Sequence, residues 1–430
     1  MRIALVNLVP RASRENYLPF NQGLGMLSAV LAGAGHNTAL FHFSRSLSNA
    51  SMMADFNPDA LFVYLATNQY PLFIDLLETW RSAGLPLIVG GPHATCLPED
   101  LAVEPGVTAV CVGEGEPCAS EIVARLERGD SFDGIANVWF ERDGSVVKNP
   151  IGVTVEDLDS LPFVDRSIFP FEAHLGTREM NILGFEFMLS RGCVYPCGYC
   201  INPLLASRLK GPRVRKKSPR RAVDEIIEVV RRYEYRGIIG FVDDVFTLDR
   251  DWLDQFGEIY RKEVALPFWC NAHINSLDEL TVKALRRAGC VRVYVGVECG
   301  SEDIRRRVLG KRITNDLILH NLELVKKHHI KLVTYFMLGI PKETEDHVQE
   351  SIALSKKIAP DRVLLSAFWP YPGTRIYDEL VADGYLDPHY YKRDAGDTFY
   401  SADGPRFDGR LEPDKFRYYF DNFIELSRAR

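Results

Sequence analysis

The chain has 430 residues, of which 46% are hydrophobic and 25% are charged, and these ordinary globular values exclude a disordered or fibrous chain. The formal net charge of −7 argues against nucleic acid as a partner, because phosphate binding usually requires a basic surface. No apolar run reaches the roughly 18 residues that a membrane-spanning helix needs.

The start of the chain and its cysteines indicate the compartment. Met1-Arg2 leads into an apolar run at 3–6 that is too short for the core of a signal peptide. The nine cysteines are odd in number and scattered, which favours reduced thiols over a disulfide framework. We therefore expect a cytoplasmic protein with no transmembrane segment.

Residues 1–150 alternate between short apolar runs and helical patterns. This alternation predicts an α/β domain with a parallel, doubly wound, Rossmann-like sheet. The dipeptide Asp143-Gly144 between two apolar runs adds a hairpin. The strands are expected at 3–8, 38–43, 59–65, 87–91, 109–113, 138–140 and 146–147, and the helices at 23–34, 70–83 and 120–128.

Two of these strands end in glycine-rich stretches, G-G-P-H-A-T at 90–95 and G-E-G-E-P at 113–117. Ligands of doubly wound sheets lie beyond the carboxyl ends of the strands, so both stretches are candidate binding loops. Neither is the G-x-G-x-x-G signature of dinucleotide-binding domains, and the glycines could serve only the turns.

Residues 151–180 are predicted to be a linker. Their first part is acidic and aperiodic, and their second part combines proline with aromatic residues in L-P-F-V-D-R at 161–166 and F-P-F at 169–171. We expect an ordered connector that packs on both neighbouring domains, although a plain surface linker would explain most of these residues.

The most specific motif is L-S-R-G-C-V-Y-P-C-G-Y-C-I-N-P at 189–203, in which Cys193, Cys197 and Cys200 stand at C-x3-C-x2-C spacing. The apolar run 182–189 predicts a buried strand that leads into the thiols. Three thiolates so close together can hold one soft metal centre. A zinc site would require a fourth Cys or His nearby, and none follows, but zinc and plain buried cysteines are the alternatives.

Residues 181–380 repeat helix and strand patterns as a partial (β/α)6 barrel of the TIM type, and a short tail, 381–430, has a helical pattern over 413–428. We expect the aromatic tail to cap the barrel mouth and to help define the substrate, or simply to pack as a helix. The barrel strands are expected at 182–189, 238–242, 268–272, 291–298, 332–338 and 362–367.

Chemistry in such barrels lies at the C-terminal ends of the strands, and candidate side chains stand there. Asp243 and Asp244 could accept hydrogen bonds from an ammonium group, or cap a helix. Glu298 could bind the hydroxyls of a ribose, because a carboxylate accepts two hydrogen bonds. Arg215, in the basic run 213–217, could meet a carboxylate, but a solvated charged face is the more usual outcome.

Together these motifs resemble the radical S-adenosylmethionine (SAM) superfamily, in particular its cobalamin-binding members of the class B radical methyltransferase type. The cysteine motif, V-D-D-V-F at 242–246, G-I-P-K-E-T at 339–344 and the two glycine-rich stretches carry the resemblance. It implies a [4Fe–4S] cluster held by Cys193, Cys197 and Cys200, with one iron open to SAM. It implies SAM contacts from Tyr199, Arg215, Asp243, Asp244, Glu298, Gly339 and Ile340. It implies cobalamin contacts from Pro10, Leu65, Ala66, Thr67, Gly90, Gly91, Pro92, His93, Gly113, Glu114, Gly115 and Glu116.

The chain departs from the family pattern at three places. The D-x-H-x-x-G motif that supplies a lower cobalt ligand in other cobalamin modules is absent, so that ligand is not named, and a domain that binds no corrin is an alternative. His93 could approach the cobalt, although histidine on a glycine loop is more often a turn or surface residue. His273 stands where similar proteins carry arginine, and it is the one catalytic candidate, which could face the substrate or be a satisfied structural histidine. Lys342 replaces a glycine.

The resemblance implies a cobalamin-dependent radical SAM C-methyltransferase, in which a 5′-deoxyadenosyl radical takes hydrogen from an unactivated carbon and methylcobalamin supplies the methyl group. The same machinery could instead close a ring, rearrange the substrate or insert oxygen, and a non-catalytic cobalamin or iron–sulfur sensor is the alternative of another class. The implied partners are an electron donor such as flavodoxin or ferredoxin and a small-molecule, lipid or protein substrate. We expect a monomer.

Overall fold

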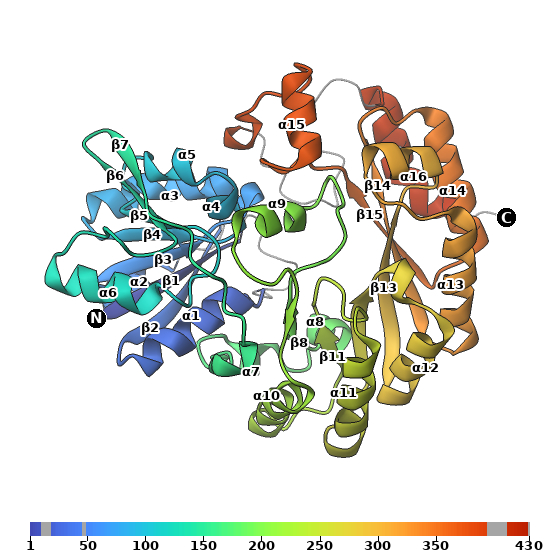
Figure 1. Ribbon diagram of the computed structural model, residues 1–430, viewed down its shortest axis with the longest axis horizontal. Coiled ribbons are helices and arrows are strands. Elements are labelled where there is room, and N and C mark those ends of the chain that lie inside the picture. Colours follow the sequence, from blue (N-terminus) through green and yellow to red (C-terminus); the bar gives the residue numbers. More distant parts are fainter. Residues whose placement is uncertain (10–18, 45–48, 394–410, 429–430) are drawn as a thin grey trace.

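The computed structural model describes residues 1–9, 19–44, 49–393 and 411–428. It contains a seven-stranded sheet in the first part of the chain, a six-stranded sheet in the second part and a two-stranded ribbon between them. The two large sheets belong to two lobes that lie next to each other, blue to cyan and green to orange in Figure 1. No helix among the described residues is long and apolar enough to cross a membrane.

The N-terminal sheet confirms the predicted doubly wound α/β architecture. Ile3 and Leu5 of the first strand pack on one face of the sheet with helices α1 and α6, while Ala4 and Val6 pack on the other face with α3 and α5. The first five strands are parallel and the hairpin pairs antiparallel beside them. In the spatial order β2-β1-β3-β4-β5-β6-β7 the strands are β1 (Arg2–Leu8), β2 (Asn37–Phe43), β3 (Ala60–Tyr64), β4 (Leu87–Gly90), β5 (Ala109–Cys111), β6 (Val138–Arg142) and β7 (Ser145–Lys148). The helices are α1 (Gln22–Gly33), α2 (Ala50–Phe56), α3 (Tyr70–Ser82), α4 (Pro92–Cys96), α5 (Pro98–Ala102) and α6 (Ala119–Arg128).

The second sheet is the expected partial barrel of six parallel strands, and helices α10 to α14 cover its outer side, whereas α15 packs in the core shared with the N-terminal lobe (Figure 1). Its order is β15-β14-β13-β12-β11-β8, so β8 and β15 are its two edges. The strands are β8 (Phe185–Phe187), β11 (Ile239–Phe241), β12 (Phe268–Ala272), β13 (Cys290–Glu298), β14 (Lys331–Leu338) and β15 (Arg362–Ala367). The helices are α10 (Pro219–Arg232), α11 (Arg250–Glu263), α12 (Glu279–Ala288), α13 (Asn315–Lys327), α14 (Glu345–Ile358) and α15 (Arg375–Ala382).

The strand predicted over 182–189 is shorter than expected, and this prediction is corrected. Residues 182 and 183 end helix α8 (Arg178–Leu183), and only residues 185–187 form β8. Gly184 separates the two elements with φ of 71°, in the left-handed region that favours glycine. A Cβ at Gly184 would lie 1.6 Å from the Ile238 carbonyl oxygen, so the close approach of the neighbouring chain also requires glycine.

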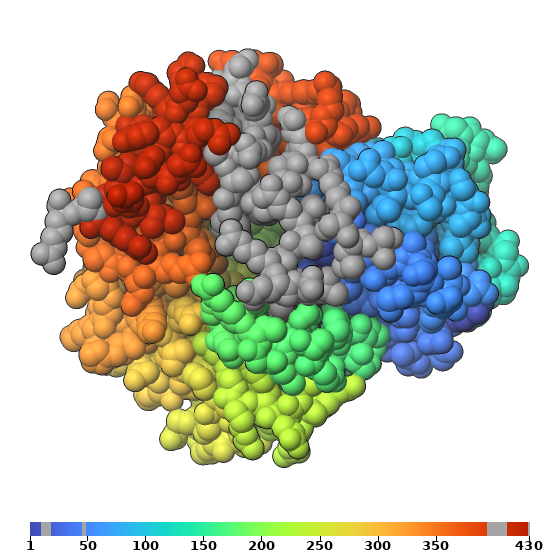
Figure 2. All heavy atoms as spheres, turned by 180° about the vertical axis from the view of Figure 1, so that it is seen from behind, coloured from blue at the N-terminus to red at the C-terminus, as the bar shows by residue number. Residues whose placement is uncertain are grey.

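The linker contacts both lobes, as the sequence predicts. The Asp165 carboxylate accepts a hydrogen bond from Ser28 Oγ of α1 at 2.7 Å, while Arg166 Nη2 donates to the Glu186 carbonyl of β8 at 2.6 Å. The Arg166 guanidinium lies over the rings of Phe20 and Phe187, one from each side of the boundary. The green segment that contains α7 (Phe171–His174) and α8 lies along the boundary in Figure 2.

The C-terminal helix α16 (Pro413–Arg428) confirms the predicted helical pattern. It packs against α14 and β15, and its Phe423 ring lies 5.4 Å from that of Phe336 in the barrel. Tyr419 Oη donates to the Glu345 carboxylate at 2.8 Å. Two aromatic residues of the predicted tail, Tyr400 and Phe407, lie outside the described residues.

Substituting Gly184→Ala should lower the free energy of unfolding by at least about 3 kcal/mol, because backbone strain adds to a clash with the Ile238 carbonyl. Gly129→Ala is the matched control: Gly129 has φ of 68° and nothing within 4 Å of its ideal Cβ, so about 1 kcal/mol is expected from strain alone. Urea denaturation measures both variants. Equal losses would show that the close approach at Gly184 carries no energetic weight.

Candidate active site

The three motif cysteines lie on the loop between β9 (Ser190–Arg191) and α9 (Ile201–Arg208). Cys197 is buried, and Cys193 and Cys200 are half-buried. Cys200 is the N-cap of α9, and its Sγ accepts a hydrogen bond from the Asn202 amide at 3.5 Å. A helix N-terminus stabilises a thiolate, so this position suits a metal ligand.

The backbone of the cysteine loop is held by contacts with distant parts of the chain. The Gly198 amide donates to the Leu309 carbonyl at 2.8 Å, and Arg213 Nε donates to the Cys193 carbonyl at 2.8 Å. A Cβ at Gly198 would lie 2.3 Å from a guanidinium nitrogen of Arg375, so the loop and this arginine pack without a gap. The thiols are therefore presented on a fixed segment.

The chemistry of the thiols fits an iron–sulfur cluster. Burial raises the pKa of Cys200 to about 11. Burial also raises the pKa of Cys193 and of Cys197, and the positive charge of nearby Lys311 offsets only part of this rise. Among the described residues, no group of three His, Cys, Asp or Glu side chains converges on one metal ion. A cluster places its thiolate ligands on separate irons, so convergence on a single point is not required of them.

Glu298 ends β13 in a strained conformation that directs it to the barrel mouth. Its φ is 73°, and the pairing of β13 with β14 shifts register between Gly296 and Glu298. The same carboxylate oxygen, Oε1, accepts from Tyr199 Oη at 3.0 Å and from Lys311 Nζ at 3.1 Å. Burial and the Glu298 charge hold the pKa of Tyr199 well above its ordinary value. The second carboxylate oxygen has no hydrogen bond in the part of the chain that the structure describes.

Gly339 and Ile340 follow β14 and are fixed by Glu343. Its Oε2 accepts from the Gly339 amide at 2.7 Å and from the Ile340 amide at 3.3 Å. Lys342, which replaces a glycine of the family pattern, has φ of 64°. The backbone here has the left-handed conformation that glycine adopts most readily, which agrees with the glycine that the resemblance implies at this position.

The two aspartates after β11 have different surroundings. Asp243 is buried, and its carboxylate accepts from Ser190 Oγ and, at 3.3 Å, from the Leu189 amide. Burial raises its pKa to about 6. This carboxylate therefore fixes the strand end before the cysteine loop. The main-chain carbonyl of Asp243 accepts a hydrogen bond from Asn271 Nδ2 at 3.2 Å. The Asp244 side chain is exposed, and the Asn202 side chain and the Gly192 backbone amide are its hydrogen-bonding neighbours.

The prediction that Arg215 meets the SAM carboxylate is corrected by its contacts. Arg215 is buried, and its guanidinium pairs with Glu114 at 2.8 Å and donates to the Val155 carbonyl at 2.7 Å. Arg191 pairs with Glu114 at 2.8 Å and with Glu116 at 2.5 Å. These ion pairs join the glycine-rich loop of the N-terminal lobe to the β9–β10 ribbon of the barrel lobe, where β10 is Arg215–Lys216.

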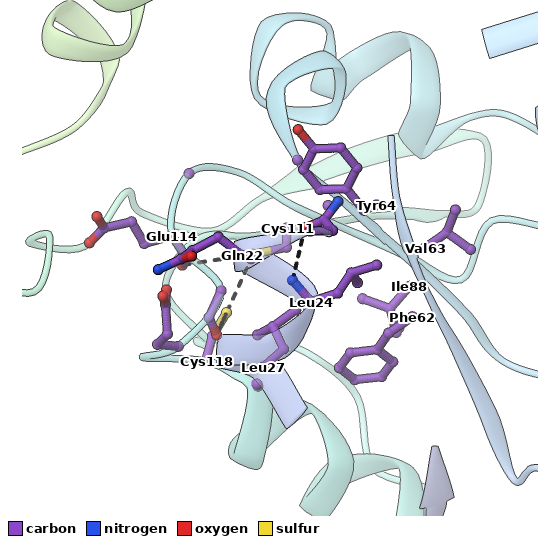
Figure 3. A pocket seen from close by; sticks show the side chains of 18 of the residues that line it. Gln22, Leu24, Leu27, Phe62, Val63, Tyr64, Ile88, Cys111, Glu114 and Cys118 are labelled. Carbon is purple, nitrogen blue, oxygen red and sulfur yellow. Dashed lines mark hydrogen bonds between the residues drawn. The ribbon is translucent and has the colours of Figure 1, made fainter. Parts of the chain in front are cut away.

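A cavity of about 500 Å³ lies at the carboxyl ends of β3, β4 and β5, between α1 and α6 and against β8 of the barrel. Its walls are largely apolar, and Figure 3 shows Leu24, Leu27, Phe62 and Ile88 around it. Of the predicted cobalamin contacts, Gly90, Gly91, Gly113, Glu114, Gly115 and Glu116 line it. Gly91 and Gly113 have φ of 100° and 90°, so the turns themselves also require glycine.

The other predicted cobalamin contacts do not line this cavity. Leu65, Ala66 and Thr67 precede α3, and Pro92 begins α4. His93 has no exposed surface, and its ring lies 5.0 Å from the rings of Tyr70 and Tyr391. Burial lowers the pKa of His93 to about 3. The expectation that His93 approaches a cobalt is therefore corrected, because the ring belongs to the packing between the lobes. Pro10 lies outside the described residues.

Two family models match the chain: the one described as the Radical SAM superfamily over residues 187–354, and the one described as a B12 binding domain over residues 12–123. A protein of Pyrococcus horikoshii named as an uncharacterized methyltransferase is 30% identical over 346 residues, which cover 78% of this chain and 72% of that protein. The chain belongs to the cobalamin-binding radical SAM family.

Other relatives carry more specific names. The cytidylyl-2-hydroxyethylphosphonate methyltransferase of Streptomyces wedmorensis is 23% identical, with 85% of this chain and 78% of that protein covered. The anaerobic magnesium-protoporphyrin IX monomethyl ester cyclase of Rubrivivax gelatinosus is 25% identical, with 68% of this chain and 53% of that protein covered.

Solved structures share the fold. The radical SAM methyltransferase TsrM of Kitasatospora setae, solved with tryptophan and a SAM analogue, matches with a TM-score of 0.69 at 17% identity, over 89% of this chain and 76% of that one. The cobalamin-dependent radical SAM enzyme OxsB matches with a TM-score of 0.68 at 19% identity, over 89% of this chain and 55% of that one. Membership of the family makes the chain an enzyme whose cofactors are a [4Fe–4S] cluster, SAM and cobalamin.

The structure adds residues that sequence reasoning missed. Lys311 donates to Glu298, 13 positions away, and Arg191 pairs with Glu116, 75 positions away, so neither contact has a local signal. Glu343 contacts the nearby Gly339 and Ile340 amides, and its place in G-I-P-K-E-T was a signal that could have found it. Glu186 did have a local signal in the sequence, because it is a lone acid in an apolar strand. His273, the catalytic candidate of the sequence analysis, stacks on Tyr195 of the cysteine loop with ring centroids 3.4 Å apart.

Glu114→Gln should lower the free energy of unfolding by about 2–3 kcal/mol, because it removes the charge that faces two partly buried arginines, Arg191 and Arg215. Glu99→Gln is the control, since its ion pair with Lys148 is exposed and is expected to contribute less than about 0.5 kcal/mol. Thermal and urea denaturation measure both. Similar small losses would refute a stabilising ion-pair network between the lobes.

Glu186 is expected to titrate near neutral pH, because burial raises its pKa from 4.5 to about 7 although the Arg166 charge opposes this. A carboxyl with a raised folded-state pKa loses stabilisation as pH rises from its unfolded-state value through its folded-state value. Relative to wild type, Glu186→Gln should therefore gain about 1–2 kcal/mol in unfolding free energy between pH 5 and pH 8. A difference that is constant across this range would place the pKa of Glu186 at its ordinary value.

Proposed function

We propose that the protein is a cobalamin-dependent radical SAM methyltransferase that methylates an unactivated carbon. The observation that carries the proposal is the position of the 500 Å³ cavity, which the glycine-rich loops share with β8, the strand that leads into the cysteine loop. A group bound at the loops would thus lie against the lobe that carries the three thiols. The names of the Pyrococcus and Streptomyces relatives support methyl transfer as the outcome.

The residues of the barrel mouth then have distinct tasks. We assign the cluster to Cys193, Cys197 and Cys200, and SAM to Tyr199, Asp244, Glu298 and the backbone of Gly339 and Ile340. The free oxygen of Glu298 can accept from ribose hydroxyls, and the exposed Asp244 carboxylate can accept from the ammonium group. Lys311 and Tyr199 orient Glu298 from the other side. Asp243 fixes the strand end through Ser190 and Leu189.

The lining of the N-terminal cavity is assigned to cobalamin. Gly90, Gly91, Gly113 and Gly115 let a flat ligand approach the backbone, and the Glu114 and Glu116 carboxylates are held by Arg191 and Arg215. When bound, the cluster and SAM supply a radical that can take hydrogen from carbon, and cobalamin supplies a methyl group. The chain supplies orientation and excludes water around the reacting atoms.

The division of the chain follows the same assignment. We propose residues 1–150 as the cobalamin-binding domain, 151–180 as the linker, 181–380 as the radical SAM barrel and 381–430 as a C-terminal cap. The contacts of Asp165 and Arg166 with both lobes support a connector within 151–180.

The experiment uses protein reconstituted without oxygen with iron, sulfide and cobalamin, and SAM labelled in its methyl group. With a strong reductant, the label should appear on cobalamin, and 5′-deoxyadenosine should form. Cys197→Ala should abolish deoxyadenosine formation, whereas Cys96→Ala, a buried cysteine outside the motif, should preserve it.

The cyclase named among the relatives defines the competing outcome. Formation of 5′-deoxyadenosine without any label on cobalamin would contradict methyl transfer and favour ring closure or another radical outcome. Absence of both products from protein that holds its iron would contradict radical chemistry itself.

A further inference from the structure

Glu186 is a carboxylate on the inner face of the barrel. Its neighbours Phe185 and Phe187 have no exposed surface and pack outward into the main core, so alternation along β8 turns Glu186 inward. β8 is the barrel edge nearest to the N-terminal sheet (Figure 1). The position is therefore inside the barrel and next to the other lobe.

Glu186 lines two cavities. One is the N-terminal cavity of about 500 Å³, and the other is a cavity of about 810 Å³ along the inner side of the barrel. Val242, the residue after β11, lines both as well. Glu186 and Val242 thus mark the junction where a molecule in the barrel comes nearest to a molecule held by the glycine-rich loops.

The Glu186 carboxylate accepts no hydrogen bond from the described residues, although the Arg166 guanidinium is near enough for its charge to lower the pKa of Glu186. Its main-chain carbonyl accepts from Arg166, but no side chain or amide in the described ranges donates to its carboxylate oxygens. A half-buried carboxylate without a hydrogen bond is unfavourable for folding, so its retention at this junction indicates a task in ligand binding.

The walls of the barrel cavity are aromatic around this carboxylate. Trp269, Tyr294 and Tyr335 line it, with the Trp269 and Tyr294 rings 5.0 Å apart. Trp269 Nε1 donates to the Leu183 carbonyl at 2.7 Å, so the indole crosses the floor of the barrel. A Cβ at Gly240 would lie 2.5 Å from the indole, so only glycine at this position leaves room for the Trp269 ring.

The opposite part of the barrel cavity carries two arginines and one aspartate. Arg362 of β15 and Arg428 of α16 are exposed there, beside the Asp421 carboxylate. A ligand along the cavity would therefore meet a carboxylate at the junction, aromatic faces along its length and arginines at the rim. Ammonium groups favour both a carboxylate and aromatic faces.

We propose that the barrel cavity takes a small substrate with an aliphatic amine, whose ammonium group is bound by Glu186. This inference rests on the proposed function, since only a methyl acceptor has to reach the junction of the two cavities. Glu186 is then the residue that sets which carbon faces the methyl donor: a carbon close to the amine.

The test measures binding rather than turnover. Calorimetry on the reconstituted enzyme at pH 7.5 compares three probes of one shape, namely 3-phenylpropylamine, 3-phenylpropanol and 3-phenylpropanoate. The amine should bind about 10-fold or more tightly than the alcohol, because it forms a charge-assisted hydrogen bond, and the carboxylate should bind most weakly. Glu186→Gln should reduce the preference for the amine to about 3-fold or less.

Glu350→Gln is the matched control, because Glu350 is exposed on α14 and makes no hydrogen bond through its carboxylate in the described part of the chain. It should keep the wild-type preference. No preference for the amine in wild type, or the same preference in Glu186→Gln, would overturn the inference. If the variant does not fold, the absence of a preference for the amine in wild type still overturns the inference.

The outcome is separable from that of the proposed function. Methyl label on cobalamin without a preference for the amine would leave methyl transfer standing and reject the role of Glu186. A preference for the amine that depends on Glu186, without label on cobalamin, would retain the site and reject methyl transfer.

Discussion

The arrangement of the molecule depends on ion pairs between the two lobes. Glu114 and Glu116 follow β5 of the N-terminal sheet, and Arg191 and Arg215 face them from the ribbon beside the cysteine loop. Burial raises the pKa of Glu114, but hydrogen bonds and charge from Arg215 and Arg191 more than offset it, so the carboxylate stays ionised. Arg191 precedes the first motif cysteine by two positions, so the same contact fixes the glycine-rich loop and the start of the cysteine loop.

Apolar packing also holds the two lobes together. One hydrophobic core runs from the outer face of the N-terminal sheet into the top of the barrel, through Tyr70, Trp369 and Tyr391. His93 lies within this packing, which is why its ring is closed to ligands. A rigid boundary of this kind keeps two large cofactors at a constant distance. Methyl transfer between separate sites would benefit from such fixed geometry.

The sequence allowed much of the fold to be predicted, because apolar runs and glycine turns are local signals. Both sheets, the cysteine loop and the helix over 413–428 follow them. The strand at 182–189 was predicted too long because the last two residues of α8 are apolar as well, and only the closeness of Ile238 shows why Gly184 must divide the run. Arg215 illustrates the harder case: its partner Glu114 lies 101 positions away, and no local pattern records such a contact.

Cofactor content tests the central claim most directly, namely that this chain holds a corrin against a radical-generating cluster. Protein purified without oxygen and supplied with cobalamin should contain about four irons and one cobalt per chain, and should show the absorption bands of both. About four irons with no cobalt after supplementation would contradict the account, because the glycine-lined cavity would then serve no corrin.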